Sequence, residues 1–254
     1  MAESSSGRVT WLGHSTVLLE EPGSRILTDP LLRRKVLHLR RHREAVEPVH
    51  PGRLDAVLIS HHHFDHFDRP SIRAIGRETT VVGGPGTAGL LRREGFRRVV
   101  EISPGEAVDL DGTRITATPA DHGGSRTPLH RHGEAVGFII EGSSRVYFAG
   151  DTDLFPELPE VAAGVDLALL PVWGWGASIG RGHLDPERAA RAVSLIAPRL
   201  AVPIHWGTLA PFGMVRRLAG LRHRPAEEFL RQAAIAAPGS EVRVLDPGGS
   251  TSYP

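Results

Sequence analysis

The sequence predicts an α/β fold in which β-sheets pack against one another and helices cover them. Short apolar runs broken by Gly, Pro and Asp dominate the chain, and clear helical patterns are interleaved with them in both halves. The 254 residues are enough for one such domain, and no linker or repeat divides them. We therefore expect a single domain over residues 1–254, with frayed tails at 1–7 and 248–254.

The N-terminal half combines strands with two short helices. Its apolar runs are bounded by turn signals such as Pro-Gly and Asp-Gly, which is typical of strands. We expect strands within residues 8–20, 24–32, 55–60, 79–84, 99–103 and 107–120, and helices at 69–77 and 86–96.

The C-terminal half continues this pattern with two longer helices. Asp185 is a typical N-cap residue, and Pro186 suits the first position of a helix within residues 184–197. Pro225 begins the second helix in the same way, within residues 225–237. The strands expected in this half lie within 135–151, 165–172, 200–206 and 241–246.

The composition limits the kinds of site and partner. The formal net charge is only +1, so we expect no specific nucleic-acid partner. The chain contains no cysteine, which leaves nitrogen and oxygen atoms as its metal ligands. Its N-terminus carries no apolar signal segment, and no stretch is long and apolar enough to span a membrane. A cytoplasmic location is the resulting expectation.

A dense cluster of titratable residues follows the apolar run 55–60, in the segment ISHHHFDHFD. Side chains two apart in an extended turn point the same way, so His61 and His63 are placed to hold one ion. Asp65 and His66 follow where the loop bends into a helix, and can face a second ion. Imidazole and carboxylate suit zinc, manganese or iron. His62 points to the opposite side, and for it we expect a structural or solvent-exposed role.

Three further polar residues, His122, Asp151 and His205, each end a β-like run. Taken singly, each has a simpler explanation as a surface histidine or a turn residue. Their joint occurrence, in this order after the His61 cluster, favours one shared metal site.

This order of residues, HxHxDH followed by His, Asp and His, resembles the metallo-β-lactamase-fold hydrolase superfamily. The segments WLGHSTVLLE, LTDPLL, ISHHHFDH, PADH, AGDTD and GHLDPERAARA…IHWGT are similar to the branch that contains ascorbate-6-phosphate lactonase and N-acyl phosphatidylethanolamine phospholipase D. The resemblance covers about residues 8–210. It implies an αββα sandwich, in which two mixed sheets are flanked by helices and the site lies at one edge between them.

The resemblance also implies a ligand set. His61, His63 and His122 would hold a first metal, Asp65, His66 and His205 a second, and Asp151 would bridge the two. The implied enzyme is a metal-dependent hydrolase, of phosphodiesterase or lactonase type, that uses a bridging hydroxide. Zinc is the first choice for the two divalent ions, with manganese and iron as alternatives. The positive charge of such a site favours a small anionic or phosphate-bearing substrate.

Several residues around the metals have roles that the sequence leaves open. Asp65 is the candidate to carry a proton to the leaving group. Asp29 either orients a ligand imidazole or forms an Asx-turn before Pro30. His14, in the segment GHST, is expected to be structural.

Two loops carry candidate substrate-binding residues. His183 and Arg126 could bind an anionic group, although surface positions in water are the alternative for both. Trp173 and Trp175 either line a pocket or pack in the core.

Residues 33–44 carry six Arg and Lys side chains. They form either a solvated loop or helix, or a basic flap that contacts an anionic substrate or a membrane surface. Two other functions remain open at this stage: a di-iron redox enzyme on the same fold, and a metal-stabilised binding module without catalysis. The oligomeric state, including a homo-oligomer, is also open.

Overall fold

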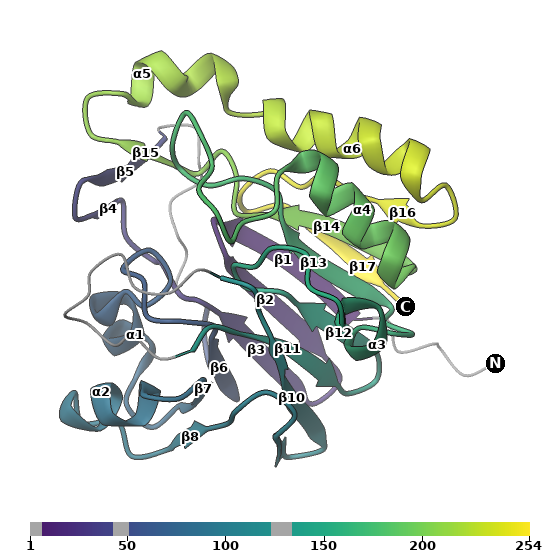
Figure 1. Ribbon diagram of the computed structural model, residues 1–254. Helices are drawn as coiled ribbons and strands as arrows, with labels where there is room; N and C mark the ends of the chain where they lie inside the picture. Colours follow the sequence, from purple (N-terminus) through teal and green to yellow (C-terminus); the bar gives the residue numbers. More distant parts are fainter. Residues whose placement is uncertain (1–6, 43–50, 123–133) are drawn as a thin grey trace.

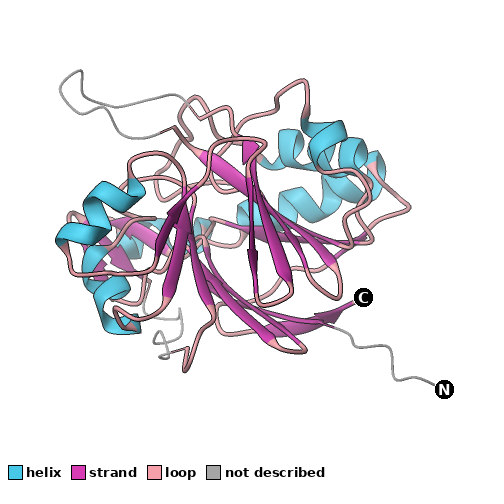
Figure 2. Ribbon diagram, turned by 90° about the horizontal axis from the view of Figure 1, so that it is seen from below, coloured by secondary structure: helices cyan, strands magenta, loops and turns pink. Residues whose placement is uncertain are grey.

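The computed structural model describes residues 7–42, 51–122 and 134–254, which form two packed seven-stranded sheets (Figures 1 and 2). In spatial order, the first sheet contains β17 (Ser250–Tyr253), β1 (Gly7–Gly13), β2 (Thr16–Glu21), β3 (Ser24–Thr28), β6 (Ala56–Ile59), β7 (Thr80–Gly83) and β8 (Val99–Glu101). The second contains β16 (Glu241–Val242), β14 (Leu200–Ile204), β13 (Leu167–Pro171), β12 (Arg145–Phe148), β11 (Val136–Glu141), β10 (Thr113–Pro119) and β9 (Ala107–Leu110).

Helices cover the outer faces of both sheets (Figure 1). The first sheet is covered by α1 (Arg69–Ile75) and α2 (Thr87–Arg93), the second by α3 (Leu158–Val161), α4 (Pro186–Ile196) and α6 (Arg224–Ala236). This is an αββα sandwich, and the predicted fold class is confirmed. None of the helices in the described part of the chain combines the length and the hydropathy that a membrane-spanning helix needs.

The alternation of side chains along each strand explains how the layers are held together. In β2, Val17 and Leu19 point into the main core between the sheets, whereas Leu18 packs in a second core beneath α1 and α2. Successive residues of a strand face opposite sides, so strands that are apolar at every position can serve two cores at once.

The expectation that residues 248–254 fray is wrong for the last strand. Ser250–Tyr253 forms β17, which pairs with β1 so that Tyr253 lies opposite Gly7. Tyr253 is buried, and its hydroxyl donates a hydrogen bond to Glu21. Gly7 lacks the β-carbon that would collide with the Tyr253 ring, which explains the close approach of the two strands. Residues 1–6 lie outside the described residues.

The two helices with proline near their start form as expected. The Asp185 side chain accepts a hydrogen bond from Arg188 N and therefore caps α4. Helix α6, which packs beside α4, has Pro225 in its first turn. The strand expected over 241–246 is shorter and comprises only β16.

The basic segment 33–44 forms neither a helix nor a simple loop. Its strands β4 (Lys35–Val36) and β5 (Leu39–Arg41) form a small sheet with β15 (Leu209–Pro211), more than 160 residues later in the chain. The short helix α5 (Val215–Leu218) and the 3-10 turn η1 (Ala219–Leu221) follow β15. The apolar residues Val36 and Leu39 alternate with exposed basic ones and are buried, which fixes the segment as strands. Residues 43 and 44 lie outside the described residues.

Candidate metal centre

The polar residues singled out in the sequence lie at one edge of the sandwich, where parallel strands end. His61 follows β6, Asp29 follows the neighbouring strand β3, and the two strands are parallel. On the other sheet, Asp151 follows β12 and His205 follows β14, with the parallel strand β13 between them. Because the carboxyl ends of parallel strands meet at one edge, four distant segments reach the same place.

Three histidines form the first group. The Nε2 atom of His61 lies 2.9 Å from His63 Nδ1, and the Nε2 atom of His122 lies 3.1 Å from the same atom. All three nitrogens lie within 4.8 Å of one another. His61 is buried, and His63 and His122 are half-buried. Solvent therefore reaches this group at His63 and His122.

The second group contains Asp65, His66 and His205, and is more deeply buried. The Nε2 atoms of His66 and His205 lie 3.1 Å apart, and Asp65 Oδ2 lies 3.9 Å from His66 Nε2. The structure therefore brings together the three residues that the resemblance assigns to a second metal.

Asp151 lies between the two groups. Its Oδ2 atom is 3.2 Å from His66 Nε2 and 4.0 Å from His61 Nε2, and its Oδ1 atom is 3.2 Å from His205 Nε2. The side chain is buried, and among the described residues Oδ1 has no hydrogen-bond donor of good geometry. A buried carboxylate oxygen of this kind fits a cation better than it fits a purely structural role.

The outer nitrogens of these imidazoles are held by neighbouring acceptors. Asp29 is fully buried, and its Oδ2 atom accepts hydrogen bonds from His66 Nδ1 at 2.8 Å and from the Ser60 hydroxyl at 2.6 Å. Since the Ser60 proton points to Asp29, the hydroxyl oxygen accepts from His61 Nδ1 at 3.0 Å. Asp29 therefore orients one imidazole directly and another through Ser60, rather than forming only a local Asx-turn.

The same arrangement holds for two further histidines. His122 Nδ1 donates to the Gly182 carbonyl at 2.8 Å, and His205 Nδ1 donates to the Trp173 carbonyl at 2.7 Å. When Nδ1 carries the hydrogen of a neutral imidazole, Nε2 presents its lone pair. In the first group, three ring nitrogens thus converge with at most one hydrogen among them.

The electrostatics of the cluster also suits a cation. Burial lowers the pKa of His61, His63 and His205, that of His63 to about 4, so these imidazoles are neutral at pH 7. Burial opposes ionisation of Asp65 and Asp151, but the surrounding histidines outweigh it and hold the pKa of both carboxyls below the usual range. Neutral imidazoles and ionised carboxylates are the forms that bind metals.

His66 differs from the other imidazoles. Burial lowers its pKa, but the carboxylates of Asp151, Asp29 and Asp65 outweigh burial and raise the pKa above the usual range of histidine. These three carboxylates therefore stabilise a positive charge at His66. A divalent ion bound there would take the place of the extra proton on the imidazole. The donor set thus fits two ions of the kind that nitrogen and oxygen ligands bind.

The sequence interpretation missed the part played by His14. It is buried in the turn between β1 and β2, and its Nε2 atom lies 3.1 Å from Asp65 Oδ2. Because an ionised Asp65 only accepts hydrogen bonds, His14 Nε2 donates here, so His14 positions the carboxylate. The centroids of the His14 and His205 rings also lie 4.0 Å apart.

A backbone signal accompanies this role. His14, Asp29 and His205 have positive φ values of 55°, 32° and 63°, and they are three of the six such non-glycine residues in the described part of the chain. Residues held in this left-handed region cluster at functional sites, since only a well-packed surrounding maintains them. No pattern of apolar spacing in the sequence reveals this.

His183 is the candidate substrate-binding residue that lies at the cluster. Its Nε2 atom is 3.3 Å from Asp151 Oδ2, and its side chain is 13% exposed, so it is the partly exposed neighbour of this carboxylate. Burial lowers its pKa, but the hydrogen bond and charge of Asp151 raise the pKa above the usual range. Arg126, the second candidate, lies outside the described residues.

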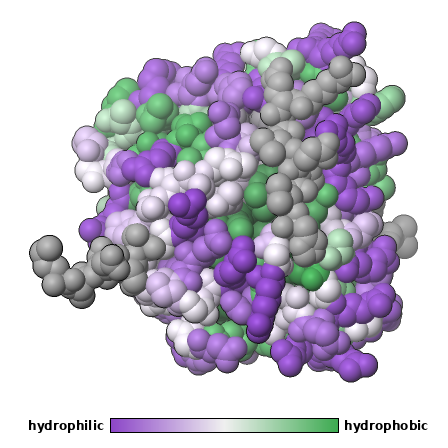
Figure 3. Space-filling view, turned by 180° about the vertical axis from the view of Figure 1, so that it is seen from behind, coloured by the Kyte–Doolittle hydropathy of each residue, from purple (hydrophilic) through white to green (hydrophobic). Residues whose placement is uncertain are grey.

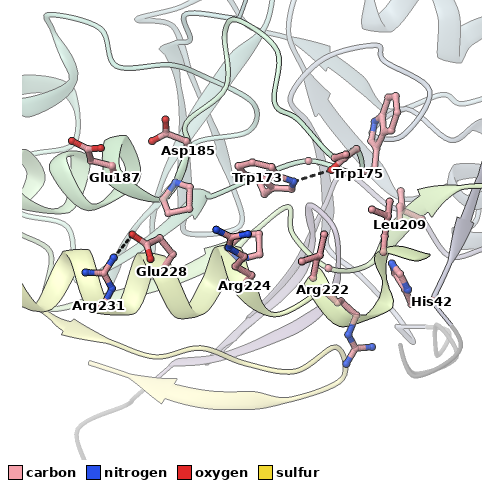
Figure 4. A pocket seen from close by; sticks show the side chains of 18 residues that line it. His42, Trp173, Trp175, Asp185, Glu187, Leu209, Arg222, Arg224, Glu228 and Arg231 are labelled. Carbon is pink, nitrogen blue, oxygen red and sulfur yellow. Dashed lines mark hydrogen bonds and ion pairs between the residues drawn. The ribbon is translucent and has the colours of Figure 1, made fainter. Parts of the chain in front are cut away.

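Trp173 and Trp175 both pack and line a pocket. The indole of Trp173 packs against the main core and donates to the Gly176 carbonyl, and Trp175 packs against the small sheet. Both face a pocket of about 650 Å³ between the start of α4 and α6 (Figure 4). None of the seven predicted ligands lines this pocket. The pocket is adjacent to the metal centre, because Trp173, which lines it, also accepts the hydrogen bond from His205. His62 points elsewhere, toward the Thr87 hydroxyl, as expected.

Comparison with known proteins places this arrangement in a family. Residues 24–206 match the Beta-lactamase superfamily domain. The chain is 33% identical to a UPF0173 metal-dependent hydrolase from Rubrobacter xylanophilus, covering 95% of this chain and 94% of that protein. It is 32% identical to a UPF0173 metal-dependent hydrolase from Caldivirga maquilingensis, covering 98% and 99%. Among solved structures, the metallo hydrolase Igni18 from Ignicoccus hospitalis aligns with a TM-score of 0.73 and 26% identity, covering 98% of this chain and 99% of that chain. The chain therefore belongs to the β-lactamase superfamily and has the metallo-β-lactamase fold, as the sequence motifs predict.

Proposed function

We propose that this protein is a metal-dependent hydrolase with two metal ions. The observation that supports the proposal most strongly is the place of Asp151, whose two carboxylate oxygens face His66 and His205 within 3.2 Å. The relatives described as metal-dependent hydrolases support the general activity. His61, His63 and His122 would hold one ion, and Asp65, His66 and His205 the other, with Asp151 shared.

The two ions, zinc first and manganese or iron as alternatives, would lower the pKa of a bound water and polarise the bond to be broken. The protein's own part is to hold the ligands rigidly. Asp29 and Ser60 fix the orientation of His61 and His66, and backbone carbonyls fix His122 and His205.

The substrate that we propose is a phosphodiester, or a lactone or other ester of a small anionic molecule. His183 supports this choice, because its Nε2 atom lies 3.3 Å from Asp151 Oδ2 and its side chain is partly exposed beside the cluster. An imidazole N–H at that position would donate a hydrogen bond to an anionic oxygen of the substrate. The neighbouring pocket beside Trp173 and Trp175 would accept a part of the substrate that does not react.

Asp65 is the proposed proton carrier for the leaving group. Its Oδ2 atom accepts a hydrogen bond from His14 Nε2, which fixes the buried carboxylate 3.9 Å from His66 Nε2. The other carboxylate oxygen, Oδ1, would take up a proton transiently on its way to the leaving oxygen.

A panel of substrates tests the proposal. Protein of measured metal content is assayed with bis(p-nitrophenyl) phosphate, a lactone that carries a carboxylate, a thioester and an amide. Turnover of the phosphodiester or the lactone, lost with a chelator and restored with metal, is the expected result. An iron-dependent optical spectrum with redox activity would favour the di-iron enzyme instead. Two bound metals without turnover of any substrate would favour a binding module.

A further inference from the structure

The small sheet and the helix after it form a basic lobe beside the metal centre. We define the basic lobe as residues 31–42 and 207–224, which comprise β4, β5, β15, α5 and η1. The first of these segments contains five Arg or Lys residues and the second four, and neither contains Asp or Glu. Figure 1 shows β4, β5, β15 and α5 gathered at one end of the molecule, away from the C-terminus.

Seven of the nine basic side chains of the lobe are exposed. The exposed basic residues of the lobe are Arg33, Arg34, Lys35, Arg40, Arg216, Arg217 and Arg224. Asp68, outside the lobe, forms an ion pair with Arg33. Glu228, also outside the lobe, interacts electrostatically with Arg224. Because the cations of the lobe outnumber these neighbouring acids, they create a positive potential that attracts an anionic surface. On the side of the molecule seen from behind, hydrophilic residues predominate along the right-hand edge, with separate hydrophobic patches among them (Figure 3).

Two large apolar side chains project between these cations. Leu37, in the β4–β5 turn, is 66% exposed, and Phe212, directly after β15, is 67% exposed. The backbone N–H of Phe212 donates to the carbonyl of His38 at 2.7 Å, so the two turns are adjacent. The Lys35 ammonium lies 5.9 Å from the centre of the Phe212 ring. The two apolar tips and their cations thus form one continuous surface.

The backbone at Leu37 makes this exposure unusual. Leu37 has a φ of 46°, and the first position of such a two-residue hairpin turn normally holds Gly, Asn or Asp. A leucine here is strained and also solvated, so neither local conformation nor burial accounts for it. An apolar medium at this tip would account for it.

We propose that the basic lobe docks on an anionic lipid surface. Leu37 and Phe212 would insert into the headgroup region, and the surrounding Arg and Lys side chains would contact the lipid phosphates. Nucleic acid is the other polyanion that a basic surface attracts, but the aliphatic Leu37 cannot stack on a base, whereas it can enter a lipid interface. The inference does not depend on which bond the metal centre hydrolyses.

Docking would place the membrane close to the metal centre. The buried residues Leu31, Val36, Leu39 and Leu209 of the lobe pack against Phe64 and Trp175. Phe64 belongs to the loop that carries the predicted ligands His63 and Asp65, and Trp175 lines the neighbouring pocket.

Vesicle sedimentation tests this proposal with the full-length protein. Vesicles of phosphatidylglycerol and phosphatidylcholine in equal amounts are compared with vesicles of pure phosphatidylcholine. We expect binding to the anionic vesicles only, and its release when the salt is raised, because salt screens the attraction. Leu37→Ser combined with Phe212→Ser should weaken binding at least about tenfold. Arg216→Glu combined with Arg217→Glu should weaken it at least about tenfold as well.

Matched controls separate docking from general effects. Ile235→Ser removes an apolar side chain that is 73% exposed on α6, and Arg97→Glu with Arg98→Glu reverses two exposed charges outside the lobe. These variants should bind within about twofold of the unmodified protein, and all variants should keep its melting temperature. Equal losses in the controls, or no binding of the unmodified protein to anionic vesicles, would overturn the proposal. So would binding to a DNA duplex but not to vesicles.

Discussion

The metal centre and the basic lobe are adjacent, but they differ in whether their ionisable side chains are buried or exposed. In the centre, titratable groups are buried and hydrogen-bonded, and Asp29 orients His66 directly and His61 through Ser60. In the lobe, basic side chains such as Arg216 and Arg217 are exposed. Burying a charged or polar group without a hydrogen-bond partner costs folding free energy, whereas water solvates an exposed charge. The buried His and Asp side chains of the centre are therefore essential to its chemistry, whereas the exposed Arg side chains of the lobe can be replaced without loss of the fold.

The largest effect is expected for the residue between the two metal groups. Asp151→Asn removes the negative charge that faces His66 and His205, so at least one ion should be lost. Turnover should fall by about a thousandfold or more. His63→Ala and His205→Ala should behave alike, because the ligands act as a set. Metal analysis and turnover of bis(p-nitrophenyl) phosphate measure both effects. Two tightly bound ions and normal turnover in these variants would refute the ligand assignment.

A smaller effect is expected one step outside the ligands. Asp29→Asn replaces the charged acceptor of His66 and Ser60 with a neutral one, and metal affinity should fall about 10–100-fold. Competition with a chromophoric chelator measures the affinity. Asp109→Asn is the control, since Asp109 pairs with Arg114 on the exposed surface. If the two variants bind metal equally well, Asp29 does not orient the ligands.

His183 lies at the boundary between the buried and the exposed region. His183→Ala should leave both metals in place and lower kcat/KM for a phosphodiester about 10–100-fold, as expected for loss of a charge-assisted hydrogen bond. The loss should be smaller for a neutral lactone, which offers fewer anionic oxygens. Equal losses on both substrates would indicate a general structural role, and no loss on either would return His183 to a surface histidine.

The smallest effect is expected in the basic lobe. Arg216→Ala combined with Arg217→Ala removes two exposed charges, so the melting temperature should change by less than about 2 °C. Metal content should stay the same. A large loss of stability or of metal would show that the lobe supports the centre, and that the contrast between the two regions is wrong.

The contrast also explains what the sequence could and could not predict. Strand-end residues such as His61 and Asp151 were predictable, because each follows an apolar run and parallel strands end at one edge. The hydrogen bond of Asp29 was foreseen as one of two alternatives.

Contacts between segments that are distant along the chain could not be predicted from the sequence. His14 meets Asp65 only because the fold brings the β1–β2 turn beside the loop after β6. In the same way, β4 and β5 find their partner in β15, and β17 returns to β1, although neither pairing has a local signal. The pocket beside Trp173 and Trp175 likewise depends on the packing of α4 and α6.

The central claim is that Asp151 lies between two metal ions, and anomalous X-ray diffraction from metal-loaded crystals tests it most directly. The account predicts two anomalous peaks about 3.5–4 Å apart. One peak should contact His61, His63 and His122, the other should contact Asp65, His66 and His205, and the Asp151 carboxylate should touch both. A single peak, or an Asp151 side chain that contacts neither peak, would contradict the account.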